Sequence, residues 1–263
     1  MLKVTCIWIL VVMSSVVTAC TSVPGTGRER LNFMPSAQMQ QLGQDGFRSI
    51  LNESTVVETG PDVTRVEAIA DRIVRSARSL YPGAELPDEW VVVVIEDDSP
   101  NAFALPGGRI GIHTGMIELA GSDDDIAIVI GHEVAHVMAD HAGERMSQAL
   151  MLAGGLALGD AALRDQNQQT RAIILSAMGA GALVGISLPY SRLHETEADE
   201  LGLMIAAHAG FDPRGAIGLW ERMAADGPSR VEFLSTHPDP SSRIDDLRRI
   251  MPSAMAMYRA ATR

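Results

Sequence analysis

Cysteine, lysine and aromatic residues are scarce in this sequence, and each scarcity narrows what the protein can do. Of 263 residues only two are cysteine, Cys6 and Cys20, and a single possible pair cannot form a disulfide framework. Aromatic residues make up 4%, which leaves few side chains on which nucleic-acid bases could stack. Basic residues are outnumbered, 21 against 33 acidic ones, and the formal net charge of −12 repels phosphate backbones. Nucleic acid is therefore not expected as a partner.

The beginning of the chain has the pattern of an export signal. One lysine is the only charged residue before Arg28, and residues 4–17 are almost wholly apolar. The small residues directly before Cys20 resemble the lipobox of bacterial lipoproteins. That resemblance implies a cleaved signal peptide over residues 1–19, a lipid on Cys20 and a polar tether over residues 20–27. It also places the protein at the periplasmic side of the outer membrane of a Gram-negative bacterium. An ordinary signal peptide and an uncleaved anchor are the alternatives.

The spacing of apolar residues predicts one α+β domain over residues 28–263, mostly helical, with a small sheet. Two early segments have helical spacing, and three short ones have the β-branched content or the turn signals of strands. Helices are expected over residues 36–51 and 62–80 and throughout the chain after Gly115, and strands over 90–95, 102–105 and 109–113. The first of these strands (WVVVVI) is expected to be buried on both faces.

Two segments rich in Ala, Gly and Leu, residues 148–163 and 172–188, occupy the middle of the chain. The second has no charged residue, and as a helix it would be about 26 Å long, short of the roughly 30 Å of a bilayer core. We therefore expect both segments to form helices that pack against the helix carrying the HEVAH motif of residues 132–136, and a membrane span is the open alternative.

The sharpest motif is HEVAH at residues 132–136. Residues four apart lie on one face of a helix, so both imidazoles can bind one Zn²⁺ while the glutamate between them sits beside the metal. A helix is predicted here independently, because Ser122 can cap its start and three aspartates follow in the first turn, where the helix dipole favours negative charge. The motif therefore predicts a zinc site on a helix.

A catalytic zinc takes three protein ligands and leaves one position open, so a third ligand is required. His141 lies about 140° round the helix from His136 and is expected to be structural. The other solution is a carboxylate on a second helix, where Glu195 and Asp199 lie four residues apart on one face. We expect Glu195 to bind the metal and Asp199 to hold a ligand histidine through its free N–H.

The other polar residues near these motifs are expected to have no part in the site. Glu197 points away from the face of Glu195 and is interpreted as a solvated charge. Three further histidines, His113, His194 and His208, are interpreted as incidental.

Together these motifs resemble one gluzincin family of zinc metallopeptidases. It includes the CAAX prenyl endopeptidases, the bacterial heat-shock membrane protease and the mitochondrial inner-membrane quality-control protease. The motifs that carry the resemblance are, in chain order, Thr26-Gly27-Arg28, Asn101-Ala102-Phe103-Ala104, Pro106-Gly107-Gly108, the HEVAH segment, residues 190–199 and Ser235-Thr236-His237-Pro238 with Arg243. The first three also resemble periplasmic lipoprotein members of the family.

The resemblance implies a zincin-like fold, one Zn²⁺ per chain and endopeptidase activity. The implied metal ligands are His132, His136 and Glu195. Glu133 would take a proton from the water that attacks the peptide bond. His237 would approach the metal from a loop, either as a latch that closes the site or as a donor to the oxyanion. Arg243 would steady the oxyanion or the substrate, and a helix-surface arginine is its alternative.

The resemblance also implies a substrate cleft along the strand over 102–105, to which an extended polypeptide could add by backbone hydrogen bonds. The implied substrate-binding residues are Asn101, Ala102, Phe103, Ala104, Pro106, Gly107 and Gly108. The implied role is quality control, with unfolded or misassembled cell-envelope polypeptides as substrates and the membrane reached through the lipid on Cys20. A chaperone or assembly factor that uses the same cleft only for binding is the alternative.

Overall fold

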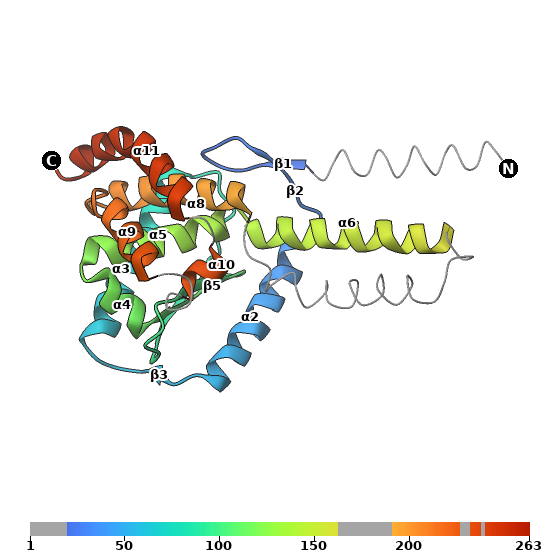
Figure 1. The fold of residues 1–263 in the computed structure, drawn as a ribbon, viewed down its shortest axis with the longest axis horizontal. Helices are drawn as coiled ribbons and strands as arrows, with labels where there is room; N and C mark the ends of the chain where they lie inside the picture. Colours follow the sequence, from blue (N-terminus) through green and yellow to red (C-terminus); the bar gives the residue numbers. More distant parts are fainter. Residues whose placement is uncertain (1–19, 163–190, 227–231, 238–239) are drawn as a thin grey trace.

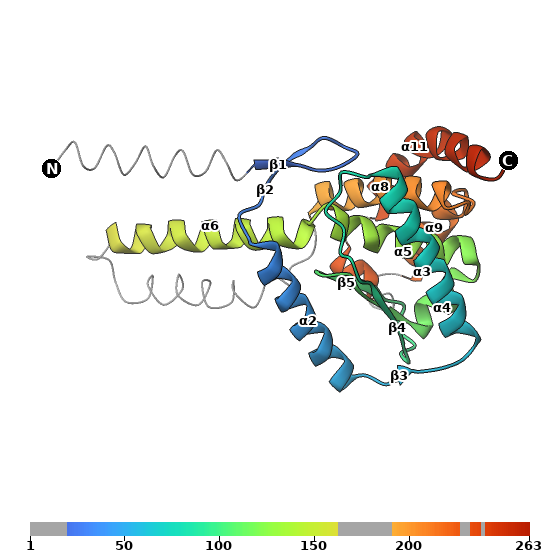
Figure 2. The ribbon, with the colours of Figure 1, turned by 180° about the vertical axis from the view of Figure 1, so that it is seen from behind.

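The computed structural model describes residues 20–162, 191–226, 232–237 and 240–263. The predicted signal peptide over residues 1–19 and the uncharged segment over 172–188 lie outside these ranges. Within the part of the chain that the structure describes, no helix is long and apolar enough to cross a membrane. The α+β class is confirmed, since long helices pack with a small sheet that lies at one edge of the body (Figures 1 and 2).

The centre of the domain is α5 (Asp123–Met138), which packs against α3 (Pro61–Leu80) on one side and α8 (Arg192–His208) on another. A fourth long helix, α11 (Pro240–Ala261), packs on α8 (Figure 1). α5 and α8 approach closely because glycines face each other: a Cβ at Gly131 would lie 2.8 Å from the carbonyl oxygen of Gly202. This contact brings the two helices that carry the predicted ligands together.

The main sheet has the strand order β3-β4-β6-β5, with bounds Val56–Val57, Val91–Ile95, Arg109–His113 and Ala102–Leu105. β4 and β6 are parallel, and the other two pairs are antiparallel. β5 is thus an edge strand, and it packs against α5. Its turn into β6 needs glycine, because Gly107 and Gly108 have φ of +85° and +76°. The expected burial of β4 on both faces holds only for Val94 and Ile95, and its first three residues are half-buried.

The other described helices lie around this core, apart from α6. α2 (Ser36–Glu53) crosses the turn between β5 and β6, where Gly43 lies against the backbone of Pro106. The remaining described helices are α4 (Thr114–Ala120), α6 (His141–Ala162), α9 (Gly215–Asp226) and α10 (Phe233–Thr236). Figures 1 and 2 show that α6 projects away from the body of the domain.

The segment predicted to be a polar tether is folded instead. β1 (Cys20–Ser22) pairs with β2 (Glu29–Leu31) in an antiparallel hairpin, and Val23 is buried in the core. The hairpin tip turns at Gly25, whose φ of +93° favours glycine and whose position against Tyr81 and Leu201 leaves no room for a side chain. The domain therefore includes residues 20–27, and the Pro/Gly-rich composition reflects a tight turn rather than a spacer.

Candidate metal centre

The start of α5 is fixed as its sequence predicts. Ser122 caps the helix by accepting a hydrogen bond from the backbone N–H of Asp125, and the three aspartates occupy the first turn. Three turns on, His132, Glu133 and His136 are all buried. The helix thus carries the HEVAH segment into the interior, between α8 and the edge strand β5.

Four side chains converge there: His132 and His136 from α5, Glu195 from α8, and His237 directly after α10. One ligand atom from each lies within 4.8 Å of the others. The two Nε2 atoms of His132 and His136 are 3.0 Å apart, and the oxygens of Glu195 lie 3.5 and 3.6 Å from them. Ligands about 2.0–2.1 Å from a tetrahedral Zn²⁺ would be separated by about 3.3–3.4 Å. These spacings fit a zinc ion.

The charge balance of the cluster also fits a cation. Burial lowers the pKa of His132 to about 4, aided by the charge of Arg243, and burial lowers the pKa of His136 well below its usual value. Both imidazoles are therefore neutral, with lone pairs free to coordinate. Burial raises the pKa of Glu195 to about 8. A cation between these groups would favour the ionised carboxylate that desolvation opposes.

His132 is supported from the side of α8 and α11. Asp199 lies one turn beyond Glu195, and its Oδ1 is 3.1 Å from His132 Nδ1, the position that the sequence predicts for it. Its other contacts are with Arg243, whose Nε and Nη2 each donate to it at 2.6 Å. Asp199 thus fixes which nitrogen of His132 carries the proton, and leaves Nε2 for the metal.

Arg243 is buried next to the predicted metal ligands. It is 1% exposed, its guanidinium pairs with Glu195 at 2.5 Å as well as with Asp199, and it stacks 3.6 Å over the ring of Trp220. A helix-surface position is thereby contradicted. The guanidinium lies beside the predicted ligands: Nη1 pairs with Glu195, and Nη2 lies 3.2 and 3.4 Å from the two ring nitrogens of His132.

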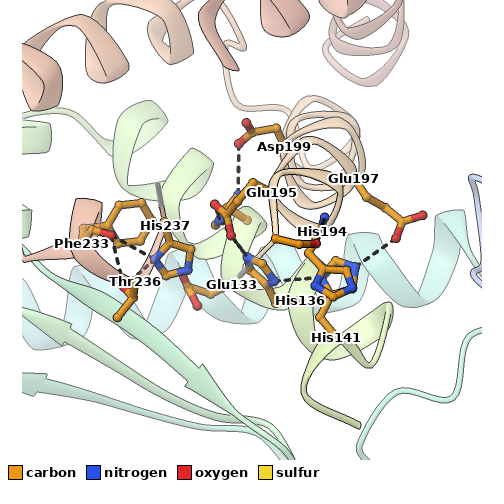
Figure 3. A network of polar contacts seen from close by, with 12 residues as sticks. Glu133, His136, His141, His194, Glu195, Glu197, Asp199, Phe233, Thr236 and His237 are labelled. Atoms are coloured by element: carbon orange, nitrogen blue, oxygen red, sulfur yellow. Dashed lines mark hydrogen bonds and ion pairs between the residues drawn. The ribbon is translucent and has the colours of Figure 1, made fainter. Parts of the chain in front are cut away.

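His136 is supported from the opposite side by His141, which is expected to be structural, and by Glu197, which is expected to be a solvated charge. Its Nδ1 lies 2.8 Å from Nδ1 of His141, and Nε2 of His141 lies 3.0 Å from Glu197 (Figure 3). The interpretation of Glu197 as a solvated charge is wrong, because its side chain is 4% exposed. His194 is not incidental either, since it is buried and stacks on His141 with ring centroids 4.4 Å apart.

His141 reaches His136 because α5 ends before it. The helix stops at Met138, Asp140 adopts a left-handed φ of 49°, and a new helix, α6, begins at His141. The expected rotation of about 140° between His136 and His141 holds only for one continuous helix. Asp140 is itself the missed signal, because Asp is a favoured cap and its Oδ1 accepts from Gly143 N.

Glu133 and His237 face each other on the open side of the cluster. Glu133 Oε1 lies 3.5 Å from His237 Nε2, and burial, with the charge of Glu195, raises the pKa of Glu133 well above its usual value. Nδ1 of His237 lies 2.8 Å from the hydroxyl oxygen of Thr236 and 3.2 Å from the carbonyl oxygen of Phe233, which can only accept. Because the hydroxyl of Thr236 donates to that same carbonyl, Nδ1 is the protonated nitrogen, and Nε2 carries the lone pair toward the cluster (Figure 3).

A cavity of about 90 Å³ opens beside Glu133 and His237. Its wall includes four of the predicted substrate-binding residues, Asn101, Phe103, Ala104 and Pro106. The structure does not bring the other three to this wall. Ala102 is buried in the core, Gly107 lines a neighbouring cavity of about 60 Å³, and Gly108 lies against Pro87 and Trp90.

The fold and this site define a metalloendopeptidase. The model of Peptidase family M48 matches residues 62–251, and the chain belongs to that family, whose members depend on zinc. The mitochondrial metalloendopeptidase OMA1 of Schizosaccharomyces pombe is 32% identical over 238 residues, which cover 88% of this chain and 66% of that protein. OMA1 of Saccharomyces cerevisiae is 32% identical over 266 residues, covering 92% and 72%. The beta-barrel assembly-enhancing protease of Yersinia pestis is 30% identical over 190 residues, covering 70% and 37%.

These relatives correct the predicted location. The likeness to mitochondrial proteins extends to plant and vertebrate OMA1 as well as to the two fungal ones. The prediction of a location at the periplasmic side of a Gram-negative outer membrane, which depended on the lipobox-like residues before Cys20, is therefore wrong. The chain spans about half or less of the length of its plant, vertebrate and bacterial relatives.

Proposed function

We propose that this chain is an endopeptidase that holds one Zn²⁺ with His132, His136 and Glu195. The observation that carries the proposal is the convergence of these three buried ligands next to Glu133, at the edge of an open cavity. Bound there, Zn²⁺ would polarise the scissile carbonyl and lower the pKa of a water at its open position to about 7. Side chains of the protein would carry out the proton transfers.

In this proposal Glu133 moves the proton. Its carboxylate lies on the cavity side of the ligand cluster, within reach of a water in the cavity, and it is not needed as a ligand. It would take a proton from the attacking water and deliver it to the leaving amine. Because burial opposes its ionised form, the positive charge of the occupied site would be needed to keep it a base.

The test is a comparison of Glu133→Gln with the wild type at equal zinc content. We expect the variant to bind zinc normally and to lose casein cleavage by at least about a hundredfold, the lower range of general-base contributions. Glu67→Gln, on the exposed face of α3, removes the same charge far from the site and should cleave as the wild type does. Wild-type turnover by zinc-loaded Glu133→Gln would contradict the assignment.

We propose unfolded or misassembled polypeptides as the substrates. β5 is an edge strand, and its neighbour Pro106 and residues Phe103 and Ala104 form one wall of the cavity. An extended chain can pair with such an edge through its backbone, which gives affinity with little demand on side chains. Casein should be cleaved, and cleavage should stop on addition of a chelator and return with Zn²⁺. A tightly folded protein of similar size should resist cleavage.

We propose that His237 is a latch on the fourth metal position. Two observations support it: His237 offers a ligand atom to the cluster, and the hydroxyl of Thr236 and the carbonyl of Phe233 together hold the proton on Nδ1. A donor to an oxyanion would need a proton on Nε2, but burial lowers the pKa of His237 well below its usual value. His237→Ala at equal zinc loading should then cleave casein faster than the wild type. A large drop in turnover would instead support the donor role.

Attachment of a lipid to Cys20 stays a prediction. In the structure Cys20 opens β1, so a lipid there would be joined directly to the folded hairpin. Mass spectrometry of the mature N-terminus tests it, and a free N-terminus at any other residue would contradict it.

A further inference from the structure

Two side chains of the N-terminal hairpin, those of Thr26 and Arg28, bind two buried carboxylates. Arg28 donates through Nε to Glu197 at 2.9 Å and through both terminal nitrogens to Glu144 at 2.7 and 3.0 Å. Thr26 adds a hydrogen bond from its hydroxyl to the second oxygen of Glu197. The side chains of Glu144 and Glu197 are 6% and 4% exposed, and that of Arg28 is 17% exposed. Charge-assisted bonds at such burial hold their partners in one geometry.

These carboxylates in turn hold a pair of stacked histidines. Glu197 lies 3.0 Å from Nε2 of His141, and Glu144 lies 3.1 Å from Nε2 of His194. The two rings stack with an interplanar angle of 27°. The carboxylates and the stacked ring together set both the plane and the rotation of His141.

These contacts determine which atom donates and which accepts in each hydrogen bond from Glu197 through His141 to His136. Glu197 accepts from Thr26 and Arg28 and is an acceptor toward His141, so Nε2 of His141 carries the proton and its Nδ1 is left as an acceptor. Nδ1 of His136, 2.8 Å away, must therefore be the donor. That leaves the lone pair of His136 on Nε2, the atom that faces His132 and Glu195.

We propose that Arg28 and Thr26 are positioning residues of the metal centre, acting through Glu197 and His141 on His136. The inference rests on the proposed zinc site and deepens it. A ligand histidine usually donates its second N–H directly to a carboxylate or a carbonyl, and loss of that partner typically weakens metal binding ten- to a hundredfold. Here an imidazole stands between the ligand and the carboxylate, and the carboxylate is fixed by donors from the start of the chain.

The test is zinc affinity of the full chain, measured by competition with a chromophoric chelator, together with the visible absorption spectrum of the Co²⁺-loaded protein. We expect Arg28→Gln to weaken zinc binding about tenfold and to shift the cobalt spectrum, because His136 loses its fixed orientation. Arg28→Lys, which can still donate to Glu197, should recover part of the affinity. Thr26→Val removes one donor at constant shape and should weaken zinc binding about threefold.

A double-mutant cycle of Arg28→Gln with Glu197→Gln shows whether Arg28 changes zinc affinity through the carboxylate of Glu197. In the Glu197→Gln background, Arg28→Gln should add little further loss, whereas independent effects would multiply. The control is Arg222→Gln, which removes an ion pair with Asp125 at the far end of α5 and should leave zinc affinity unchanged. If Arg28→Gln does not fold, the Thr26→Val result decides.

The outcomes separate this inference from the proposed function. A wild-type chain that binds no zinc would overturn the proposed function itself. A wild-type chain that binds zinc, with Arg28→Gln and Thr26→Val within twofold of it and unchanged cobalt spectra, would overturn only the positioning role. Equal loss in the Arg222→Gln control would also overturn it, because the effect would then be general destabilisation.

Discussion

The two histidines of the metal centre are supported in different ways by opposite ends of the chain. His132 contacts Asp199 directly, and Asp199 is held by Arg243 of the C-terminal helix α11. His136 contacts His141 first, and only then Glu197 and Arg28 of the N-terminal hairpin. Both supporting carboxylates lie on α8, two residues apart, on either side of the helix that also supplies Glu195.

The difference lies in burial and in the number of links. Arg243 is 1% exposed, while the side chain of Arg28 is 17% exposed on a hairpin with strands of three residues. The C-terminal support, Asp199 with Arg243, therefore contacts His132 directly and is buried from solvent within the helical core. The N-terminal support reaches His136 through three residues, His141, Glu197 and Arg28, and its arginine is closer to solvent. The two predicted ligand histidines thus contact two parts of the fold that differ in burial, and we expect the less buried part to unfold more readily.

The largest expected effect is on stability, from Arg243→Gln. Removing the guanidinium leaves Asp199 and Glu195 buried without their cation, and loss of one partner of a buried pair costs about 3–5 kcal/mol. Urea denaturation of the metal-free wild type and variant gives the free energy of unfolding of each, and the difference is this cost. Arg28→Gln should cost less, about 1–2 kcal/mol, because water can reach that site. A larger cost for Arg28→Gln would reverse the comparison.

The next effect is on zinc affinity, from Asp199→Asn. Because Asp199 contacts His132 without an intermediate, its loss should weaken zinc binding ten- to a hundredfold. Glu197→Gln acts on His136 through one more imidazole, so its effect should be the smaller of the two. Competition with a chelator gives the zinc dissociation constants of both variants, and their ratio compares the two effects. Equal losses would mean that His141 transmits the support of Glu197 without attenuation.

The sequence alone predicts the C-terminal support better than the N-terminal one. HEVAH, Glu195 and Asp199 obey helical spacing, so a local rule places each of them on the correct face. The long helices and three of the four strands of the main sheet follow from the same kind of periodicity, and the glycines after β5 indicate its turn into β6. The two-residue strand β3 is too short for any periodicity to predict it.

The N-terminal support depends on pairings that no local rule contains. Arg28 and Glu197 are 169 residues apart in the chain, and Glu197 alone on a helix has the pattern of a surface charge. His141 appeared to face away because the break at Asp140 was not recognised. The hairpin itself was concealed by its Pro/Gly composition, which is shared by tight turns and flexible linkers.

The smallest expected effect is a pH dependence at the N-terminal support. Burial alone would raise the pKa of Glu144, but hydrogen bonds from His194 and Arg28 lower it to about 2, from an ordinary value of 4.5. A carboxyl with a depressed pKa in the folded state stabilises the protein above its unfolded pKa, and that contribution is lost as the pH falls from about 4.5 toward 2. Glu144→Gln lacks this contribution at every pH.

The gap in unfolding free energy between wild type and Glu144→Gln should therefore be widest at pH 6 and narrow steadily on acidification to pH 3.5. Urea denaturation of the metal-free proteins at intervals across this range measures the gap. Glu67→Gln, on the exposed face of α3, should show a gap near zero throughout. A gap for Glu144→Gln that stays constant with pH would mean that the hairpin is held by shape alone, since the acid-labile part of its attachment to the metal centre would then contribute nothing.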